Sequence, residues 1–407
     1  MHYYLAPMEG ITTYIYRNAY AHYFGGIDKY FTPFVSDKNF VSDKDLSAGP
    51  NNSRHKNTRE IRDILPENNT GITLIPQIMS NDAPRFLAAA AKIASYGYDT
   101  VNLNLGCPSG TVTARKRGSG FLSVPDELDA FLSEIYDKCP IKISIKTRLG
   151  ISELAEWDRL IQIYAKYPID ELIIHTRLQQ EFYAGKTHPE CFAAALSPFR
   201  TAGISLCYNG DIVSAESLRA AFYEIRQSYN SAENTGAANN GIADTAPSPA
   251  TAHDKDAGMP DRVMIGRGIL QNPGLIRQLR SADSGCSGLS NDSGSQAKSA
   301  ASFHDDIHAP AAGTTHHDTD TSKAASFSET AYRETLRAFH DEILDGYVRI
   351  MSGDSPTLFK MKDLWTYMSR NIPGAEKQLK KIRKANRLTE YTAAVDGLFR
   401  ECDICPL

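Results

Sequence analysis

The sequence predicts an α/β fold: an eight-stranded parallel β/α barrel of the TIM type, followed by a small C-terminal helical domain. Short β-rich runs recur roughly every 30 residues, and most of them end in polar or glycine residues and precede a helical pattern. Strands that alternate with amphipathic helices form parallel sheets, and eight such units can close a barrel. The chain has 407 residues, 42% of them hydrophobic, which is enough for a barrel and a second domain.

The eight runs follow one another within residues 1–280, which we assign to the barrel. They are YYLAPMEG (3–10), KYFTPFVS (29–36), TLIPQIMS (73–80), TVNLNLGCP (100–108), IKISIKTRLG (141–150), ELIIHTR (171–177), SLCYNGD (205–211) and RVMIGRG (262–268). Apolar residues with helical spacing lie between them and predict helices from Pro84, Glu127 and Ser214.

Two segments interrupt this pattern. Residues 229–260, before the eighth strand, and residues 281–328, after the barrel, are rich in small and polar residues and have few large apolar ones. Such a composition cannot build a core, so both segments are predicted to be disordered. We interpret four histidines of the second segment as part of a solvated tract and predict no metal site: His304, His308, His316 and His317.

Residues 329–407 are predicted to form a small bundle of helices, because apolar residues recur at three- and four-residue spacing. Within them, the run KQLKKIRKANR (377–387) has six basic residues in eleven, although the whole chain has a formal net charge of −4. The run is either a solvated helix face or a surface that contacts the phosphates of a nucleic acid.

Composition excludes several classes of protein. The net charge of −4 excludes a uniformly basic nucleic-acid binder, so such binding would need a local patch. No apolar run of about 18 residues is present, and the start MHYYLAPMEG does not resemble a signal peptide. Seven scattered cysteines do not indicate a disulfide framework. We therefore expect a cytoplasmic protein without a membrane partner.

Polar side chains gather at the carboxyl ends of the predicted strands, which form the active-site face of β/α barrels. Any one of them could simply cap a strand, but the whole set indicates a site. The set consists of Met8 and the polar or reactive side chains Glu9, Gln77, Asn104, Cys107, Lys146, Arg148, His175, Arg177, Asn209, Asp211 and Arg267.

Two features of this set point to a flavin nucleotide. The motifs CYNGD and MIGRG put glycines and backbone N–H groups beside Arg267, where barrels often bind phosphate. Lys146 lies in an apolar strand, where a lysine is costly unless it is paired or functional. At the barrel mouth, its amine could hydrogen-bond the electron-rich edge of a flavin and stabilise the reduced form.

The motifs APMEG, PQIM, NLNLGCPSGTV, IKTRLG, HTR, NGD and MIGRG, in this order, resemble the tRNA-dihydrouridine synthase family of FMN-dependent barrels. The resemblance covers about residues 1–280, and the C-terminal helices are similar to the RNA-binding domain of these enzymes. It implies an oxidoreductase that reduces the carbon 5–carbon 6 double bond of a uridine in tRNA. FMN would be the cofactor and NADPH the electron donor. We expect a monomer that binds tRNA.

The resemblance also implies roles for individual residues. The FMN site would include Pro7, Met8, Glu9, Gln77, Lys146, His175, Asn209, Gly210, Asp211, Gly266 and Arg267. Asn104, Lys146, His175 and Arg177 would surround the uracil. The loop after Cys107 lacks the lysine that many members carry soon after the CP pair, and APMEG resembles only some subfamilies, so the target uridine is left open.

Cys107 is the expected catalytic residue. Reduction of uracil needs a hydride at carbon 6 and a proton at carbon 5 from the opposite face, and a thiol on a loop over the pocket can donate that proton. Cys139, Cys191 and Cys207 fall in helical or strand patterns and are interpreted as packing residues.

Extruding a uridine from folded RNA costs a few kcal/mol and calls for a broad contact with the RNA backbone. The candidates for phosphate contact are Arg115, Lys116 and Arg117 beside the Cys107 loop, and Lys380, Lys381, Arg383 and Lys384 in the helical domain. Two other functions remain open: an FMN barrel oxidoreductase with a small-molecule substrate, similar to dihydroorotate dehydrogenases, and a non-catalytic RNA-binding barrel.

Overall fold

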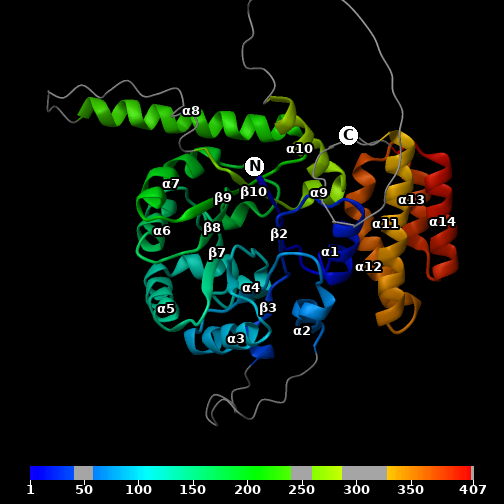
Figure 1. The fold of residues 1–407 in the computed structure, drawn as a ribbon, viewed down its shortest axis with the longest axis horizontal. Helices are drawn as coiled ribbons and strands as arrows, with labels where there is room; N and C mark the ends of the chain where they lie inside the picture. Colours follow the sequence, from blue (N-terminus) through cyan, green and yellow to red (C-terminus); the bar gives the residue numbers. More distant parts are fainter. Residues whose placement is uncertain (41–57, 240–258, 287–327, 405–407) are drawn as a thin grey trace, which may run out of the picture.

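The computed structural model describes residues 1–40, 58–239, 259–286 and 328–404. The predicted disorder of residues 240–258 and 287–327, and the interpretation of the four histidines, concern residues outside these ranges. Figure 1 shows a barrel surrounded by helices, with a separate group of helices beside it.

The barrel is closed and entirely parallel. Its strands within the described residues are β1 (His2–Leu5), β2 (Lys29–Phe31), β3 (Val35–Ser36), β4 (Leu74–Ile75), β5 (Gln77–Met79), β6 (Thr100–Leu105), β7 (Lys142–Arg148), β8 (Glu171–His175), β9 (Ser205–Asn209) and β10 (Arg262–Ile265). From β5 to β10 each strand pairs with the next, β10 pairs with β1, β1 with β2, and β2 with β4.

Pro76 divides one extended segment into β4 and β5, and this segment completes the ring. Proline has no N–H to donate to the ladder, but its carbonyl oxygen still accepts a 2.9 Å hydrogen bond from the amide of Asn102 in β6. β2 and β3 are likewise two parts of one predicted run. The ten short strands therefore occupy the eight positions that the sequence predicted.

Helices follow most of the barrel strands, and the longer ones cover the outside of the barrel (Figure 1). They are α1 (Tyr14–Tyr23), α2 (Arg59–Ile64), α3 (Ala83–Ser95), α4 (Gly110–Thr113), α5 (Pro125–Lys138), α6 (Glu156–Tyr164), α7 (Pro189–Thr201), α8 (Ala215–Asn239), α9 (Arg267–Gln271) and α10 (Leu275–Cys286). In α3, the sequence determines both where the helix begins and which face is buried. The side chain of Asp82 caps it by accepting a 2.9 Å hydrogen bond from the amide of Arg85, and Phe86, Ala90 and Ile93 turn towards the strands and are buried.

The C-terminal helices form the predicted bundle. They are α11 (Glu329–Ile350), α12 (Asp354–Met368), α13 (Glu376–Lys384) and α14 (Leu388–Glu401). Figure 1 shows that α1 lies between the barrel and this bundle. Phe339 of α11 packs edge-on against Tyr16, Tyr20 and Phe24, with ring centroids 5.5, 6.4 and 5.2 Å away. No helix of the described ranges is both long and apolar enough to cross a membrane.

The bundle also touches the loop that follows β1. The Nζ atom of Lys360 in α12 donates a 2.8 Å hydrogen bond to the carbonyl oxygen of Gly10, and the hydroxyls of Thr13 and Tyr347 lie 3.0 Å apart. The helical domain is therefore joined directly to the loop that contains Met8 and Glu9.

Both segments that were predicted to be disordered begin too early in the sequence. Residues 229–239 belong to α8, and residues 281–286 belong to α10 rather than to the linker. A segment with few apolar residues builds no core. An existing helix can still extend into it, because adding a residue to a formed helix costs little free energy. At the second boundary, the hydroxyl of Tyr3 donates a 2.9 Å hydrogen bond to the carboxylate of Asp283, so the barrel extends beyond residue 280.

Candidate active site

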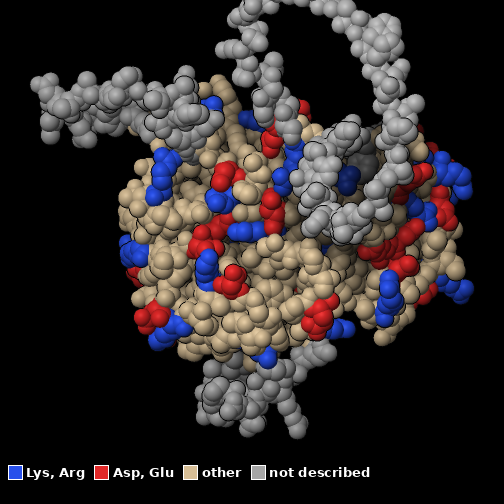
Figure 2. All heavy atoms as spheres, viewed as in Figure 1, with Lys and Arg blue, Asp and Glu red and all other residues tan. Residues whose placement is uncertain are grey.

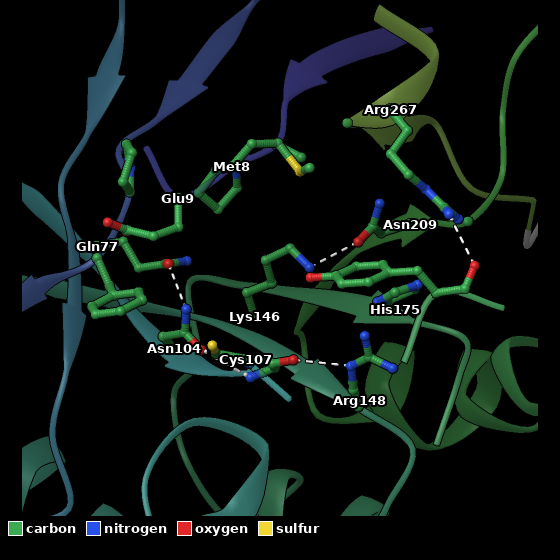
Figure 3. Close-up of a pocket in the computed structure, with 18 of the residues that line it drawn as sticks. Met8, Glu9, Gln77, Asn104, Cys107, Lys146, Arg148, His175, Asn209 and Arg267 are labelled. Carbon is green, nitrogen blue, oxygen red and sulfur yellow. Dashed lines mark hydrogen bonds between the residues drawn. The ribbon is translucent and has the colours of Figure 1, made fainter. Parts of the chain in front are cut away.

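A pocket opens at the carboxyl ends of the barrel strands (Figure 3). All residues expected at the FMN site line it: Pro7, Met8, Glu9, Gln77, Lys146, His175, Asn209, Gly210, Asp211, Gly266 and Arg267. Asn104, Cys107 and Arg148 line it as well. Figure 3 shows Met8 and Glu9 on one side of the pocket and Cys107 and Arg148 on the other, with Lys146 reaching into the space between them.

Lys146 lies at the centre of this pocket. Its Nζ atom donates a 2.8 Å hydrogen bond to Oδ1 of Asn209, whose own amide nitrogen donates a 2.8 Å hydrogen bond to the carbonyl oxygen of Met264. Burial, reinforced by the positive charge of Arg148, lowers the pKa of Lys146 from 10.5 to about 7. The amine is thus poised to take up a proton when an anionic group enters the pocket.

His175 is a neutral imidazole in this environment. Burial and then the nearby positive charges, Arg148 first, hold its pKa well below the ordinary value of 6.5. Nη1 of Arg177 lies 3.4 Å from Nε2 of His175. Because a guanidinium can only donate, Nε2 is the acceptor and the proton resides on Nδ1. His175 can therefore donate one hydrogen bond without carrying a charge.

Asp211 joins two arginines at one end of the pocket. Its carboxylate accepts hydrogen bonds from Arg267, which lines the pocket, and from Arg177, which is 2% exposed and lies behind the pocket wall. Burial raises the pKa of Asp211, but the bonds from Arg177 and Arg267 outweigh it and hold the pKa below its ordinary value. Arg177, expected beside the uracil, therefore supports Asp211 and does not line the pocket.

The two loops that meet at this end approach each other too closely for a side chain at Gly268. A Cβ atom there would lie 2.0 Å from the carbonyl oxygen of Ile212. Glycine is thus required by the contact between the loops after β9 and β10. This contact sets the position of Gly210 and Arg267, the expected phosphate-binding residues.

Asn104 connects the floor of the pocket to the Cys107 loop. Its Nδ2 atom donates a 2.6 Å hydrogen bond to Oε1 of Gln77, and its Oδ1 atom accepts 3.0 Å hydrogen bonds from the amides of Gly106 and Cys107. Nε of Arg148 donates a 2.9 Å hydrogen bond to the carbonyl oxygen of Gly106. The backbone at Cys107 is therefore held on both sides of the peptide that precedes it.

The Cys107 thiol remains protonated around neutral pH. Burial raises its pKa above 9.0, with a contribution in the same direction from the negative charge of Glu9, while Ser109, Arg148 and Lys146 act in the opposite direction. A thiol with a raised pKa is a poor nucleophile but keeps a proton to donate.

Sequence reasoning missed part of the lining, namely Ala6, Pro33, Phe34, Gly106 and Tyr183. The ring of Tyr183 lies against two pocket arginines, with Cζ of Arg148 5.4 Å and Cζ of Arg267 5.3 Å from its centroid. The signal was its place in the loop after β8, eight positions beyond His175, since the loops after barrel strands build the site.

The basic residues expected to contact RNA differ in their surroundings. Arg115 is exposed, Lys116 pairs with Glu127 at 2.9 Å on the surface, and Arg117 pairs with the buried Asp37. The four basic side chains of α13, Lys380, Lys381, Arg383 and Lys384, are exposed, while Leu379 and Ile382 of the same helix are buried. Figure 2 shows acidic and basic side chains interspersed over the visible face, with basic ones along the outer edge of the helical domain.

A family model described as dihydrouridine synthase matches residues 4–228, from β1 into α8. The chain belongs to the dihydrouridine synthase family. The match includes Cys107, Lys146 and His175 and ends before Arg267 and the helical domain. The protein is therefore an oxidoreductase, and the two alternatives left open by the sequence patterns are not favoured.

Relatives of this chain include a probable tRNA-dihydrouridine synthase of Staphylococcus aureus, 26% identical over 271 residues, which cover 66% of this chain and 68% of the relative. tRNA-dihydrouridine synthase B of Pasteurella multocida is 25% identical over 285 residues, which cover 68% of each chain. The tRNA-dihydrouridine(16) synthase of Aquipseudomonas alcaligenes is 24% identical over 283 residues, which cover 69% of this chain and 76% of the relative.

Among solved structures, a morphinone reductase aligns with 69% of this chain and 86% of its own chain, with 11% sequence identity and a TM-score of 0.36. No group of three or more histidine, cysteine or acidic side chains within the described residues is arranged to hold a metal ion.

Proposed function

We propose that this protein reduces the carbon 5–carbon 6 double bond of a uridine in folded tRNA, with FMN as its cofactor and NADPH as its electron donor. The observation that carries the proposal is the arrangement of Lys146, His175 and Cys107 around one pocket. They supply a buried amine, a neutral imidazole and a protonated thiol.

The side chains of the pocket fit a flavin mononucleotide. Two of the three protons of the Lys146 ammonium are not used by Asn209 and can point towards the carbonyl edge of a flavin ring. Arg267 and the backbone of the loops after β9 and β10 suit the phosphate, while Asp211 orients Arg267. Bound FMN would supply the hydride that carbon 6 of the uracil receives.

The protein itself supplies the proton and the orientation of the base. Cys107 lies across the pocket from Met8 and Glu9 (Figure 3), so a uracil placed between them would present one face to the thiol. Donation of the thiol proton to carbon 5 leaves a thiolate, which Lys146 and Arg148 would stabilise. His175 and Asn104 would hydrogen-bond the carbonyl oxygens of the base without adding charge.

The basic side chains of α13 are proposed to contact tRNA phosphates. Lys380, Lys381, Arg383 and Lys384 are exposed on a helix whose opposite face packs into the bundle. Such contacts position an RNA without reading its bases and would offset the cost of extruding the target uridine.

The proposal is tested with purified protein and unmodified tRNA. We expect a yellow protein whose bound FMN is reduced by NADPH and reoxidised by tRNA, and we expect mass spectrometry of the digested tRNA to show dihydrouridine. NADPH oxidation should depend on RNA. A colourless protein, or NADPH oxidation that needs no RNA and leaves every uridine intact, would overturn the proposal.

A further inference from the structure

Arg117 makes a two-pronged ion pair with Asp37 that joins the loop after β6 to the residues that follow β3, two strands separated in the sheet only by β5. Nη1 and Nη2 of Arg117 donate hydrogen bonds of 3.1 and 2.9 Å to the two carboxylate oxygens of Asp37. Nε of the same guanidinium donates a 3.1 Å hydrogen bond to Oδ1 of Asn81. Three of the five N–H groups of the Arg117 guanidinium are therefore directed into the protein.

The partner carboxylate is wholly buried. The Asp37 side chain has 0% exposure, the Arg117 side chain has 15%, and Oγ of Ser80 donates a further 2.7 Å hydrogen bond to Asp37. A bidentate arginine–carboxylate pair fixes both position and orientation, and a buried carboxylate that loses its partner is left with an uncompensated charge. The exposed pair Lys116–Glu127, one residue away, has neither property.

The ion pair sits at the returning end of the loop that carries Cys107. The amide and the hydroxyl of Ser119 donate hydrogen bonds of 3.0 and 2.9 Å to the carbonyl oxygen of Cys107. Gly118 packs against the same residue, so closely that a Cβ atom would lie 2.7 Å from that carbonyl oxygen. Movement of Arg117 would therefore be passed through Gly118 and Ser119 to Cys107.

The backbone around Arg117 is strained in a way that needs such an anchor. Lys116 has a φ of 50° and Gly118 a φ of 55°, both in the left-handed region, and Lys116 is not a glycine. A residue other than glycine keeps this backbone conformation only where the surrounding structure holds it.

We propose that Arg117 is a positioning residue: its ion pair with Asp37 fixes the loop that holds the Cys107 thiol over the pocket, and it is not a phosphate contact. The inference rests on the proposed function in one respect, because the thiol is taken as the proton donor to the base. This proposal replaces the sequence-based expectation that Arg117 contacts RNA. Arg115, exposed and two positions earlier, keeps that expected role.

The experiment compares Arg117→Gln and Arg117→Lys with the parent protein in four measurements: flavin reduction by NADPH, tRNA affinity, flavin reoxidation at saturating tRNA, and the rate at which iodoacetamide alkylates Cys107. For Arg117→Gln we expect unchanged reduction and affinity, reoxidation slowed by roughly 10- to 100-fold as expected for a misplaced reacting group, and faster alkylation. Arg117→Lys should lie between Gln and the parent, because lysine keeps the charge but not the two-pronged contact.

Arg159→Gln is the matched control, since it removes an arginine from an exposed 3.0 Å ion pair with Asp126 on the outside of the barrel. It should match the parent in all four measurements. Parental reoxidation and alkylation rates in Arg117→Gln, with weakened tRNA affinity, would overturn the proposal and make Arg117 a phosphate contact. If the glutamine variant does not fold, Arg117→Lys decides: parental rates in both assays would contradict the proposal.

If the proposed function itself is wrong, the same measurements give a different result. In that case the parent protein would not be reoxidised by tRNA at all. The alkylation rate of Cys107 needs no substrate, so it would still report whether the ion pair holds the loop.

Discussion

Nζ of Lys146 donates a hydrogen bond of 2.8 Å to Oδ1 of Asn209, and so connects the ends of β7 and β9, which are separated in the sheet by β8. The amine gains this bond but loses water, and its pKa falls to about 7. A buried amine without a carboxylate partner costs stability, which is typical of a residue kept for function.

The first prediction is that Lys146→Met stabilises the flavin-free protein at pH 7 while it abolishes activity. The unfolded chain holds the Lys146 proton up to about pH 10.5, whereas the folded chain loses it above about pH 7. Between these values the unfolded state binds more protons, so rising pH favours the folded state. The melting temperature of the variant should therefore exceed that of the parent most at pH 7 or below, and the difference should shrink towards pH 10.

Thermal melts of both proteins from pH 6 to pH 10 check this prediction. Lys142→Met is the control, because Lys142 begins the same strand, is 66% exposed and should show no such pH-dependent difference. A constant difference between Lys146→Met and the parent at every pH would mean that the lysine keeps its proton in the folded protein.

The second prediction concerns Cys107. Cys107→Ala should bind FMN and accept electrons from NADPH, but reoxidation of the flavin by tRNA should slow by roughly 10²- to 10⁴-fold, as for a lost general acid. Because the thiol pKa is raised above 9.0, the parental rate should stay constant through neutral pH and fall only in alkaline solution, where the thiol ionises. Cys107→Ser should retain part of the rate without the alkaline fall.

Stopped-flow absorbance in single-turnover experiments with excess tRNA gives these rates. Cys139→Ala serves as the control, since Cys139 is a half-buried thiol at the end of α5, outside the pocket, and should leave the rate unchanged. A parental rate in Cys107→Ala would show that the proton comes from another group.

The order of the barrel strands could be predicted from the sequence because each strand combines an apolar run with a polar or glycine-rich end. Active sites of β/α barrels lie at the carboxyl ends of the strands, and this correctly predicted that Lys146, His175 and Asn209 share one pocket. The extension of α8 to Asn239 was missed, because composition reports whether a segment can build a core and not whether a helix continues into it.

Two features of the site depend on contacts between loops that no local pattern encodes. Arg117 looked like a surface cation within a basic run, yet its partner Asp37 lies 80 positions away in sequence. Tyr183 follows a predicted strand end at a distance set by the path of the loop. In both cases the decisive information is which loops pack against each other, and that depends on the three-dimensional paths of the loops.

The third prediction tests the phosphate end of the pocket. Arg267→Ala should weaken FMN binding by about 1.5 to 3 kcal/mol, the range for a hydrogen bond to a charged group. The binding constant is measured by flavin fluorescence with flavin-free protein. Arg159→Ala, on the outside of the barrel, should leave it unchanged. Asp211 keeps its bond to Arg177 in the Arg267 variant, so the fold should be preserved, and an unchanged FMN affinity would remove Arg267 from the phosphate site.

The last prediction concerns the basic face of α13. Reversing Lys380, Lys381, Arg383 and Lys384 to glutamate should weaken tRNA binding. It should also reduce the slope of log affinity against log salt concentration by up to about four, because about one fewer counterion is released from the RNA for each phosphate contact that is lost. Flavin reduction by NADPH should not change, since these side chains point away from the bundle core and lie outside the pocket.

The matched control reverses the same number of charges on the outside of the barrel, at Lys138, Lys142, Arg159 and Lys166, which are all about half exposed or more. Both variants change the net charge equally, so a general electrostatic effect would weaken tRNA binding in both and alter their salt dependence alike. Contact by α13 predicts a large effect in the first variant only. Equal effects in the two would show that the basic run is a solvated helix face, and that the RNA is held elsewhere.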